Sequence, residues 1–527
     1  MALASACRMT DFLRTVFMTH TSTATRGTAG HNWLQLLAAC LTGILIPLCF
    51  TGPAVVLPSI SQELGGTAVQ LNWVVNGYIL TYGSAMMAAG SLTDVYGRKR
   101  VWLVGLALFT LVTFAIPLAP SVGWIDGLRL VQGIGGAAAF AGATSSLAQT
   151  FHGSIRTRVF SLLGTTFGIG LAFGPLAAGW LVEIASWRWV FLATALIGVA
   201  GFGLVSASAT ESRDPQAGEL DWLGTISFTA ALTLFTYGIL LAPEYGWRSS
   251  TVIGSLFAAV VLFVTFVYIE RHVARPMLDL SLFGRARFVG VQVLGASPAF
   301  FFVTLIVMLP GRFIGIDGLS ALEAGQMMIA LAAPLLVVPF LAALLSRWFT
   351  SGVLSGIGLL LVAVGLIWLG GALEGGAGPT LEAPLTLIGV GIGLPWGLMD
   401  GMAVSVVEKE RAGMATGIFN CVRVSADGIA IAVAGALLAF VIQGGLLSAL
   451  VAADPIVVIA AANRAALGDL AQATALVPGE RALLLATYDQ AFSWVLYVLA
   501  ASSALTALLV FILLGHSRAH EDAVAAV

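Results

Sequence analysis

The stretch Gly90-Ser91-Leu92-Thr93-Asp94-Val95-Tyr96-Gly97-Arg98-Lys99-Arg100 decides the fold of this chain. It places one acid, two glycines and three cations in a short connection between two long apolar runs. Glycine permits a tight turn, and charged side chains are costly to place in hydrocarbon. The stretch therefore predicts a turn at a membrane surface that joins two membrane-spanning helices.

The composition agrees with a protein that has lipid as its main solvent. Of the 527 residues, 59% are hydrophobic and 9% are charged, whereas soluble domains carry about 25% charged residues. The net charge of −2 gives no indication of a nucleic-acid partner. The 4 cysteines form no CxxC pair and the 6 histidines fall in predicted loops or tails. We therefore expect no metal, no cofactor and no enzymatic activity.

The apolar runs predict a polytopic membrane protein. A helix needs about 20 apolar residues to cross a bilayer, and fourteen runs meet this requirement: 34–57, 71–91, 101–119, 124–149, 158–182, 187–208, 221–242, 250–270, 288–309, 322–345, 352–370, 382–405, 411–442 and 489–514. With a cytoplasmic N-terminus, 17 Lys and Arg residues fall in inside segments and 5 in outside segments. This bias predicts that both termini are cytoplasmic.

The pattern of Gly90–Arg100, G-x-L-x-D-x-x-G-R-K-R, resembles the loop signature of the major facilitator superfamily of secondary transporters. Fourteen spans resemble its drug:proton antiporter branch. The resemblance implies an all-α membrane protein with the major facilitator fold, in which two six-helix bundles are joined by two extra transmembrane helices. It also implies that Gly90, Asp94, Gly97 and Arg98 act in gating and proton coupling. An ordinary basic loop is the alternative interpretation.

A second motif, Arg129-Leu130-Val131-Gln132-Gly133-Ile134-Gly135-Gly136, resembles the R-x-x-Q-G-x-G-A stretch of the fourth helix in this family. Arg129 lies inside a predicted span, where a charge costs about 2.5–3.5 kcal/mol at the helix centre. It should therefore face a cavity or a partner, for which Asp126 is a candidate. The resemblance implies a role for Arg129 and Gln132 in proton coupling. The alternative is an arginine whose side chain reaches the membrane surface.

A third motif, Gly170-Leu171-Ala172-Phe173-Gly174-Pro175-Leu176-Ala177-Ala178-Gly179, resembles the antiporter signature G-x-x-x-G-P-x-x-G-G of the fifth helix. Gly170 and Gly174 lie on one helical face and allow a neighbouring helix to approach closely. Pro175 cannot donate the helical hydrogen bond and should bend the span. The motif predicts a hinge formed by Gly170, Gly174, Pro175 and Gly179 and favours export. Generic packing of small residues is the alternative.

The chain departs from the branch pattern in its first span. Many fourteen-helix drug exporters carry an acid there, but Cys49 occupies that place and residues 34–57 contain no Asp or Glu. An acid in the cavity can attract a cationic drug or carry a proton, so its absence argues against cationic drugs as substrates.

The second half of the chain supplies other charges within predicted spans. Asp400, Arg423 and Asp427 need a partner or a function at this depth. We interpret them as the wall of a substrate cavity, with Asp400 as the preferred proton site. Arg423 could instead hold an anionic group of the substrate. The structural alternative is a satisfied pair, Arg423–Asp427 or Arg423–Asp400, that only joins helices.

The expected organisation comprises a cytoplasmic tail, a first bundle, two linker helices with a cytoplasmic linker, a second bundle and a second cytoplasmic tail. The ranges are 1–33, 34–208, 209–287, 288–514 and 515–527. Residues 443–488 form an external segment within the second bundle. Asp454-Pro455 and Val477-Pro478-Gly479 suggest that this segment is a helical hairpin.

The predicted function is proton-coupled export of small organic molecules by alternating access, as in multidrug or toxic-compound efflux. The expected protein is a multi-pass monomer in the bacterial inner (plasma) membrane, with protons, a small-molecule substrate and the lipid bilayer as its partners. One alternative is export of an anionic natural product such as a carboxylate siderophore. Another is a non-transporting membrane sensor or scaffold with the same fold, which would dock partners through 443–488 and 271–287.

Overall fold

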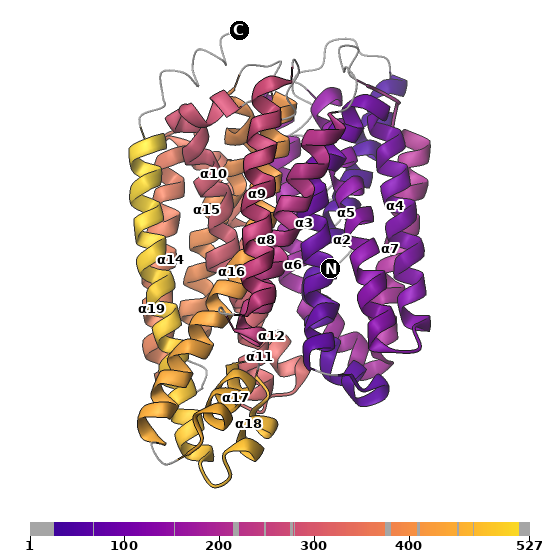
Figure 1. Cartoon of the computed structure of the whole chain (residues 1–527). Helices are drawn as coiled ribbons and strands as arrows, with labels where there is room; N and C mark the ends of the chain where they lie inside the picture. The colour runs from indigo at the N-terminus through magenta and orange to yellow at the C-terminus, as the bar shows by residue number, and fades with distance from the viewer. Residues whose placement is uncertain are drawn as a thin grey trace, which may run out of the picture.

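The computed structural model describes residues 26–66, 68–151, 153–213, 221–246, 249–273, 278, 280–374, 381–407, 412–450, 453–466 and 468–515. These residues form helices and connecting turns and contain no β-strand (Figure 1). The predicted tails 1–33 and 515–527 lie largely outside the described residues.

Six helices form one bundle on the right of Figure 1. They are α2 (Arg26–Leu64), α3 (Ala68–Tyr96), α4 (Arg98–Ala115), α5 (Val122–Thr150), α6 (Gly153–Ile184) and α7 (Trp187–Ser208). Helix α5 packs between α3 and α4, and α2 packs against α6 and α7. A 3₁₀ turn, Ile116–Leu118, follows α4.

The second bundle, on the left of Figure 1, contains two interrupted helices. Its elements are α10 (Ala286–Pro298), a π turn (Ala299–Val303), α11 (Thr304–Gly315), α12 (Ala321–Ala332), a 3₁₀ turn (Ala333–Leu336), α13 (Val338–Leu345), α14 (Ser351–Glu374), α15 (Glu382–Ser405), α16 (Ala412–Ala449) and α19 (Arg481–Leu514). Pro298 immediately precedes the π turn and Pro334 lies in the 3₁₀ turn. Proline removes a helical hydrogen bond, which explains why both spans change geometry at these points.

Two further helices, α8 (Trp222–Tyr245) and α9 (Ser250–His272), pack together in front of the junction between the bundles (Figure 1). Helix α8 contacts both α3 and α16, so it touches one helix of each bundle. The side chain of Asp221 accepts a hydrogen bond from the backbone N–H of Gly224 at 2.9 Å and caps the start of α8. A 3₁₀ turn, Leu280–Gly284, leads from this pair into α10.

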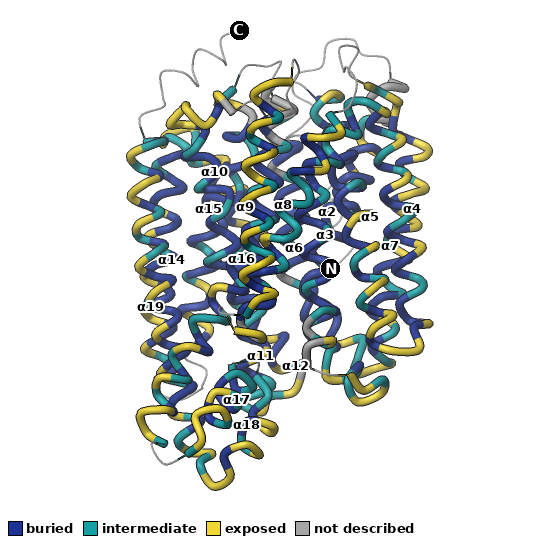
Figure 2. The backbone as a smooth tube through the Cα atoms, viewed as in Figure 1, coloured by how far each residue is buried: buried dark blue, intermediate teal, exposed yellow. Residues whose placement is uncertain are grey.

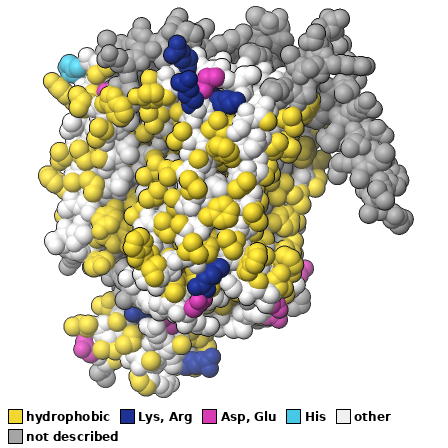
Figure 3. All heavy atoms as spheres, turned by 90° about the vertical axis from the view of Figure 1, so that its right-hand side faces the viewer, with side chains coloured by type: hydrophobic (Ala, Val, Ile, Leu, Met, Phe, Trp, Pro, Cys, Tyr) yellow, Lys and Arg dark blue, Asp and Glu magenta, His cyan; other side chains and the backbone are white. Residues whose placement is uncertain are grey.

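The helices present apolar side chains outward, as lipid requires. Large hydrophobic residues such as Val104, Leu111, Leu196 and Val199 are exposed on α4 and α7. Figure 3 shows this face covered by hydrophobic side chains, with charged side chains near its upper and lower margins. In Figure 2 the helices at the sides and the front, such as α19, α4 and α9, show many exposed turns, whereas the helices behind them are mostly buried.

Eleven helices of the described residues are long and apolar enough to cross a membrane, and twelve if the bent α6 is included. The other two of the fourteen predicted spans correspond to α3 and α5, which are 29-residue helices packed inside the first bundle. The all-helical architecture is as predicted, whereas the number of fourteen spans stays a prediction.

Residues 443–488 contain a helical hairpin, as the sequence suggested. It consists of α17 (Pro455–Ala466) and α18 (Leu470–Leu476) and lies below α11 and α12 in Figure 1. Asp454 accepts a hydrogen bond from the N–H of Ile456 at 2.9 Å, and Gly479 adopts a positive φ of 87°. The flanking helices extend further than predicted, since α16 continues to Ala449 and α19 begins at Arg481.

A buried arginine lies where the hairpin meets the second bundle. Arg312 of α11 is 2% exposed; its Nη2 atom lies 2.7 Å from Asp489 Oδ1 and its Nε atom 3.6 Å from Asp317 Oδ2. A Cβ atom on Gly315 would lie 2.0 Å from the carbonyl oxygen of Gly468, so the hairpin packs directly on α11 at this point.

Candidate functional site

The Gly90–Arg100 motif forms the turn between α3 and α4. Gly97 adopts a φ of 105°, and a Cβ atom at this position would lie 2.4 Å from Glu211 Oε1. The backbone conformation therefore favours glycine, and a larger residue would also displace the Glu211 carboxylate. Gly90 lies one turn before Asp94, and no atom lies within 4 Å of a Cβ built at Gly90.

The charged residues of this turn bind one another and the segment after α7. Arg98 is 7% exposed and forms an ion pair with Asp94 at 3.1 Å. The backbone N–H of Arg98 donates to the carbonyl of Ser212 at 2.9 Å, and that of Lys99 donates to Glu211 at 3.3 Å. The sequence marked Asp94 and Arg98 as gating residues but missed Glu211 and Ser212, because nothing in their local pattern shows where α7 ends in space.

Arg129 lies at the centre of a polar network inside the first bundle. Its side chain is fully buried; Nε donates to the carbonyl of Val74 at 2.6 Å and Nη2 to the carbonyl of Cys49 at 2.6 Å. Nη1 donates to Gln132 Oε1 at 2.5 Å. The alternative of an arginine that reaches the membrane surface is therefore wrong.

Neutral groups, not an acid, hold this guanidinium. Within the described residues Arg129 forms no ion pair, and Asp126 Oδ1 is buried without a hydrogen-bond partner. Gln132 donates in turn to the hydroxyl of Thr113 at 2.6 Å. The Arg129 guanidinium also lies 4.5 Å from the centre of the Tyr78 ring. Cys49, at the place of the expected acid, thus contributes its backbone carbonyl to the arginine.

The glycines of the third motif bring α6 against α2. A Cβ atom on Gly170 would lie 2.5 Å from Pro47 Cγ, and one on Gly174 would lie 2.0 Å from Thr51 Oγ1. Gly179 is buried on the same helix. The two halves of α6, Leu162–Leu171 and Phe173–Ile184, meet at an angle of 41°. The bend lies one turn before Pro175, where the ring of a proline removes a hydrogen bond and displaces the preceding carbonyl.

Another buried arginine lies between the bundles. Arg423 of α16 is 5% exposed, and its Nη1 atom forms an ion pair with Asp400 Oδ1 of α15 at 3.3 Å. Of the pairings that the sequence left open, the structure therefore shows Arg423–Asp400. The guanidinium lies 4.6 Å from the ring centre of Phe167 on α6 and 5.3 Å from that of Trp396 on α15.

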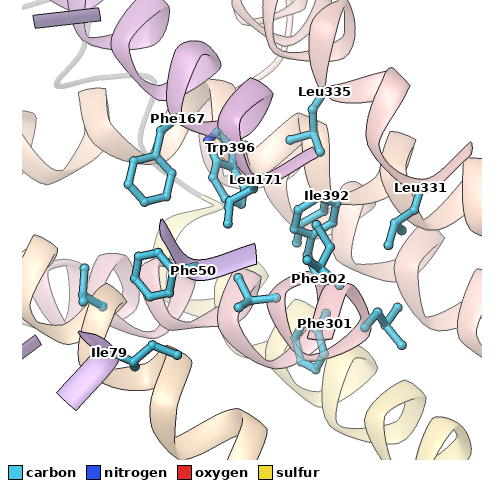
Figure 4. Packing of buried hydrophobic residues seen from close by; sticks show 14 of the residues in the cluster. Phe50, Ile79, Phe167, Leu171, Phe301, Phe302, Leu331, Leu335, Ile392 and Trp396 are labelled. Atoms are coloured by element: carbon cyan, nitrogen blue, oxygen red, sulfur yellow. The ribbon is translucent and has the colours of Figure 1, made fainter. Parts of the chain in front are cut away.

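Arg423, Asp400 and Phe167 line a small cavity. Its wall is formed by residues of α5, α6, α15 and α16, and its volume is about 10 Å³, which is room for one water molecule. Trp396 Nε1 donates to the carbonyl of Gly164 at 2.9 Å, and a Cβ atom on Gly164 would lie 2.9 Å from Asp400 Oδ2. Figure 4 shows Phe167, Trp396 and Leu171 gathered at this junction.

Asp427 lies one turn beyond Arg423 on α16 and is 6% exposed. Its carboxylate is close enough to Arg423 and to Tyr82 of α3 to interact electrostatically with both. Tyr82 is fully buried and its hydroxyl has no hydrogen-bond partner within the described residues. The ring of Tyr82 stacks on Tyr78 at 5.7 Å, so two tyrosines of α3 connect the surroundings of Arg129 and Arg423.

The sequence missed three aromatic residues at this site. Trp396 precedes Asp400 by four residues, so helical periodicity could have placed both on one face. Phe167 and Tyr82 carry no such signal, because they reach Arg423 from helices that are distant in the sequence.

A small cavity with a buried ion pair in its wall, placed between two bundles of long apolar helices, is the arrangement expected of a membrane transporter. A model of the Major Facilitator Superfamily matches residues 39–433, and the chain belongs to this superfamily. Membership of a family of transporters agrees with the expectation that the chain is not an enzyme.

The alignments with curated relatives cover about three quarters of the chain. Multidrug resistance protein Stp of Mycobacterium tuberculosis (strain CDC 1551 / Oshkosh) is 30% identical over 413 residues, which cover 77% of this chain and 76% of the relative. The tetracenomycin C resistance and export protein of Streptomyces glaucescens is 28% identical over 420 residues, covering 79% and 78%. Among solved structures, a double-tryptophan mutant of XylE superposes with a TM-score of 0.59 at 15% identity, covering 94% and 99%. The last similarity supports the fold.

Proposed function

We propose that this protein is a proton-coupled exporter of small organic molecules, acting as a multidrug or toxic-compound efflux transporter by alternating access. The observation that carries the proposal is the small cavity between the bundles, with the Arg423–Asp400 ion pair in its wall. Relatives named as resistance and export proteins support the direction of transport. An ionisable group at this depth supports a proton-dependent step.

The proposed movement is a rocking of the 34–208 bundle against the 288–514 bundle around the cavity. The bend of α6 supports a hinge that includes Gly170, Gly174, Pro175 and Gly179. The helices of the linker range 209–287 would move with this junction, because α8 contacts α3 and α16.

The first bundle would couple the movement to protons. Gly90, Asp94, Gly97 and Arg98 would stabilise one end of the bundle when it is closed, through the ion pair and the contacts with Glu211 and Ser212. Arg129 and Gln132 would transmit changes between α2, α3 and α5, which their hydrogen bonds join. We propose that both termini are cytoplasmic, that the membrane is the bacterial inner membrane and that the protein acts as a monomer.

In the second bundle we assign Asp400 as the proton site, with Arg423 and Asp427 as cavity groups. An ionised Asp400 needs a positive neighbour in this environment, and Arg423 supplies one. Loss of that neighbour during transport would leave Asp400 to take a proton. Export of an anionic natural product is a second candidate because of the buried Arg423, although its pairing with Asp400 leaves less positive charge for an anion.

The test uses purified protein in liposomes with an acidic lumen and a fluorescent pH indicator inside. Ethidium serves as the cationic probe and a hydroxycarboxylate chelator as the anionic one. We expect ethidium to drive proton release from liposomes with wild-type protein and no release with Asp400→Asn. Glu382→Gln is the matched control, because Glu382 is an exposed carboxylate at the other end of the same helix, α15.

Proton release with the anionic chelator alone would replace drug efflux by export of an anionic natural product. Release that persists in Asp400→Asn would refute Asp400 as the proton site. Silence with a panel of both probe classes, from protein that orients correctly in the liposomes, would favour the sensor or scaffold function.

A further inference from the structure

The guanidinium of Arg423 occupies a site that has the composition of a receptor for an organic cation. Aromatic rings face it from two different bundles, Phe167 at 4.6 Å and Trp396 at 5.3 Å, and the Asp400 carboxylate lies at 3.3 Å. Aromatic faces with an adjacent carboxylate are the groups that bind quaternary and aromatic cations in proteins. Here a side chain of the protein itself fills that position.

The cavity beside Arg423 is too small for a drug-sized ligand while the Arg423 side chain stays in place. A drug-sized ligand needs a pocket of about 300–1,000 Å³, whereas the cavity beside Arg423 has a volume of about 10 Å³. A ligand therefore has to displace a side chain as well as separate the bundles. Arg423 has a long side chain in the wall of the cavity, and it forms a single ion pair, with Asp400.

A second position for the guanidinium lies one turn further along α16. Asp427 is 6% exposed, and the ion pair of Arg423 within the described residues goes to Asp400, which leaves Asp427 without one. The fully buried hydroxyl of Tyr82, which has no hydrogen-bond partner in the described part of the chain, lies within electrostatic reach of both Arg423 and Asp427. Residues four apart are neighbours on one helical face, so Arg423 can reach Asp427 by side-chain rotation.

We infer that Arg423 is an internal occupant of a cation cage formed by Phe167, Trp396 and Asp400, and that an aromatic organic cation binds by displacing it onto Asp427 and Tyr82. This inference rests on the proposed transport function and specifies an organic cation as the substrate, with Asp400 in place of the acid that the first span lacks. Each cation then has one carboxylate as its counterion, since the ligand replaces Arg423 beside Asp400 while Arg423 pairs with Asp427. It also assigns Asp427 a role as the alternative counterion, a positioning role distinct from that of Asp400.

The test is equilibrium binding to purified protein in lipid nanodiscs without a proton gradient. The probes are tetraphenylphosphonium and tetraphenylborate, which have nearly the same shape and opposite charge. If Arg423 fills the cage about nine tenths of the time, its removal raises the apparent affinity about tenfold. We therefore expect Arg423→Met to bind tetraphenylphosphonium about tenfold more tightly and tetraphenylborate no more tightly than the wild type.

A double-mutant cycle separates the proposed role of Asp427 from a structural one. Asp427→Asn removes the alternative counterion, so it should weaken tetraphenylphosphonium binding severalfold when Arg423 is present. In the Arg423→Met background the same substitution should have no effect. Trp396→Leu should weaken binding in both backgrounds, because the cage itself is damaged, and it keeps the inference testable if Arg423→Met does not fold.

Weaker tetraphenylphosphonium binding in Arg423→Met, or equal effects of Asp427→Asn in both backgrounds, would overturn the inference. Unchanged binding in Trp396→Leu would do the same. Because these measurements need no gradient, they are independent of the liposome assay. A cage that binds as expected without any proton release would leave the binding site intact and refute the proposed coupling.

Discussion

Arg129 and Arg423 are buried to nearly the same degree, at 0% and 5% exposure, but they are held in different ways. Arg129 donates short hydrogen bonds to two backbone carbonyls and to Gln132, all within the first bundle. Arg423 has one longer ion pair to Asp400 and two aromatic neighbours, one from each bundle. Backbone carbonyls are fixed by their helices, whereas a carboxylate can be exchanged for another acid. The comparison indicates that Arg129 is a fixed part of one bundle and that Arg423 can change partners.

Arg129→Met should have the largest effect on stability. The substitution removes three buried hydrogen bonds from a charged donor, to the carbonyls of Val74 and Cys49 and to the amide oxygen of Gln132. A hydrogen bond to a charged group contributes about 1.5–3 kcal/mol, so we expect a loss of about 3 kcal/mol or more in the free energy of unfolding. Thermal unfolding in detergent checks this with a thiol-reactive fluorophore, because Cys40, Cys49 and Cys421 are buried in the folded protein. Stability equal to the wild type would show that the network is not structural.

Asp400→Asn should be less destabilising, although it also breaks a buried contact. Removal of one partner from a buried ion pair usually costs about 3–5 kcal/mol. Asp427 lies one turn from Arg423 and can replace the lost carboxylate, so we expect about 1–2 kcal/mol. The double variant Asp400→Asn/Asp427→Asn removes both acids and should lose the full amount. Equal stability losses in the single and double variants would contradict the exchange of partners.

The substitution Cys49→Asp would make the surroundings of Arg129 resemble those of Arg423, which has an acidic partner. Cys49 Sγ lies 3.5 Å from Gln132 Nε2, beside the Arg129 guanidinium. A carboxylate here would give Arg129 an acidic partner, and hydrogen bonds to charged groups contribute about 1.5–3 kcal/mol before desolvation is subtracted. We expect Cys49→Asp to be about 1 kcal/mol more stable than the matched Cys49→Asn variant, measured by circular dichroism during heating. A less stable Asp variant would mean that the neutral partners already satisfy Arg129.

The smallest expected effect concerns a third buried arginine, Arg312, which has two acids close by. Asp317 lies between the spans; burial raises its pKa, although Arg312 acts in the opposite direction. The folded state therefore binds this proton more tightly than the unfolded state does. The free energy of unfolding should rise as the pH falls from above the pKa of Asp317 in the folded protein towards the ordinary pKa of an aspartate.

Asp317→Asn should lose this part of the pH dependence. We expect a smaller difference between its unfolding temperatures at about pH 7.5 and about pH 5 than in the wild type. Glu480→Gln, at the start of α19 near the same hairpin, is the control. An unchanged pH dependence in Asp317→Asn would show that Asp317 does not titrate differently in the folded state.

Much of the architecture could be predicted from the sequence because lipid imposes a strong one-dimensional signal. Long apolar runs must become helices that satisfy their own backbone hydrogen bonds, and charged turns must lie between them. This reasoning located the turn at Gly97, the bend near Pro175 and the helices of the 443–488 hairpin. It did not find the π turn after Pro298, because a proline in a span is compatible with several local geometries.

The sequence predicted the charged residues of the candidate site but not the contacts that these residues make. The depth of Arg129, Arg423 and Asp400 in apolar runs was enough to mark them, since a charge within the membrane requires compensation. The sequence alone thus determined that this is a helical membrane protein with ionisable groups inside it. Only the tertiary structure decided that Arg129 donates hydrogen bonds to carbonyls, that Arg423 pairs with Asp400 and that Arg423 lies beside Phe167 and Trp396. Those partners come from helices more than 20 residues apart or from the other bundle, and their meeting depends on how the helices pack.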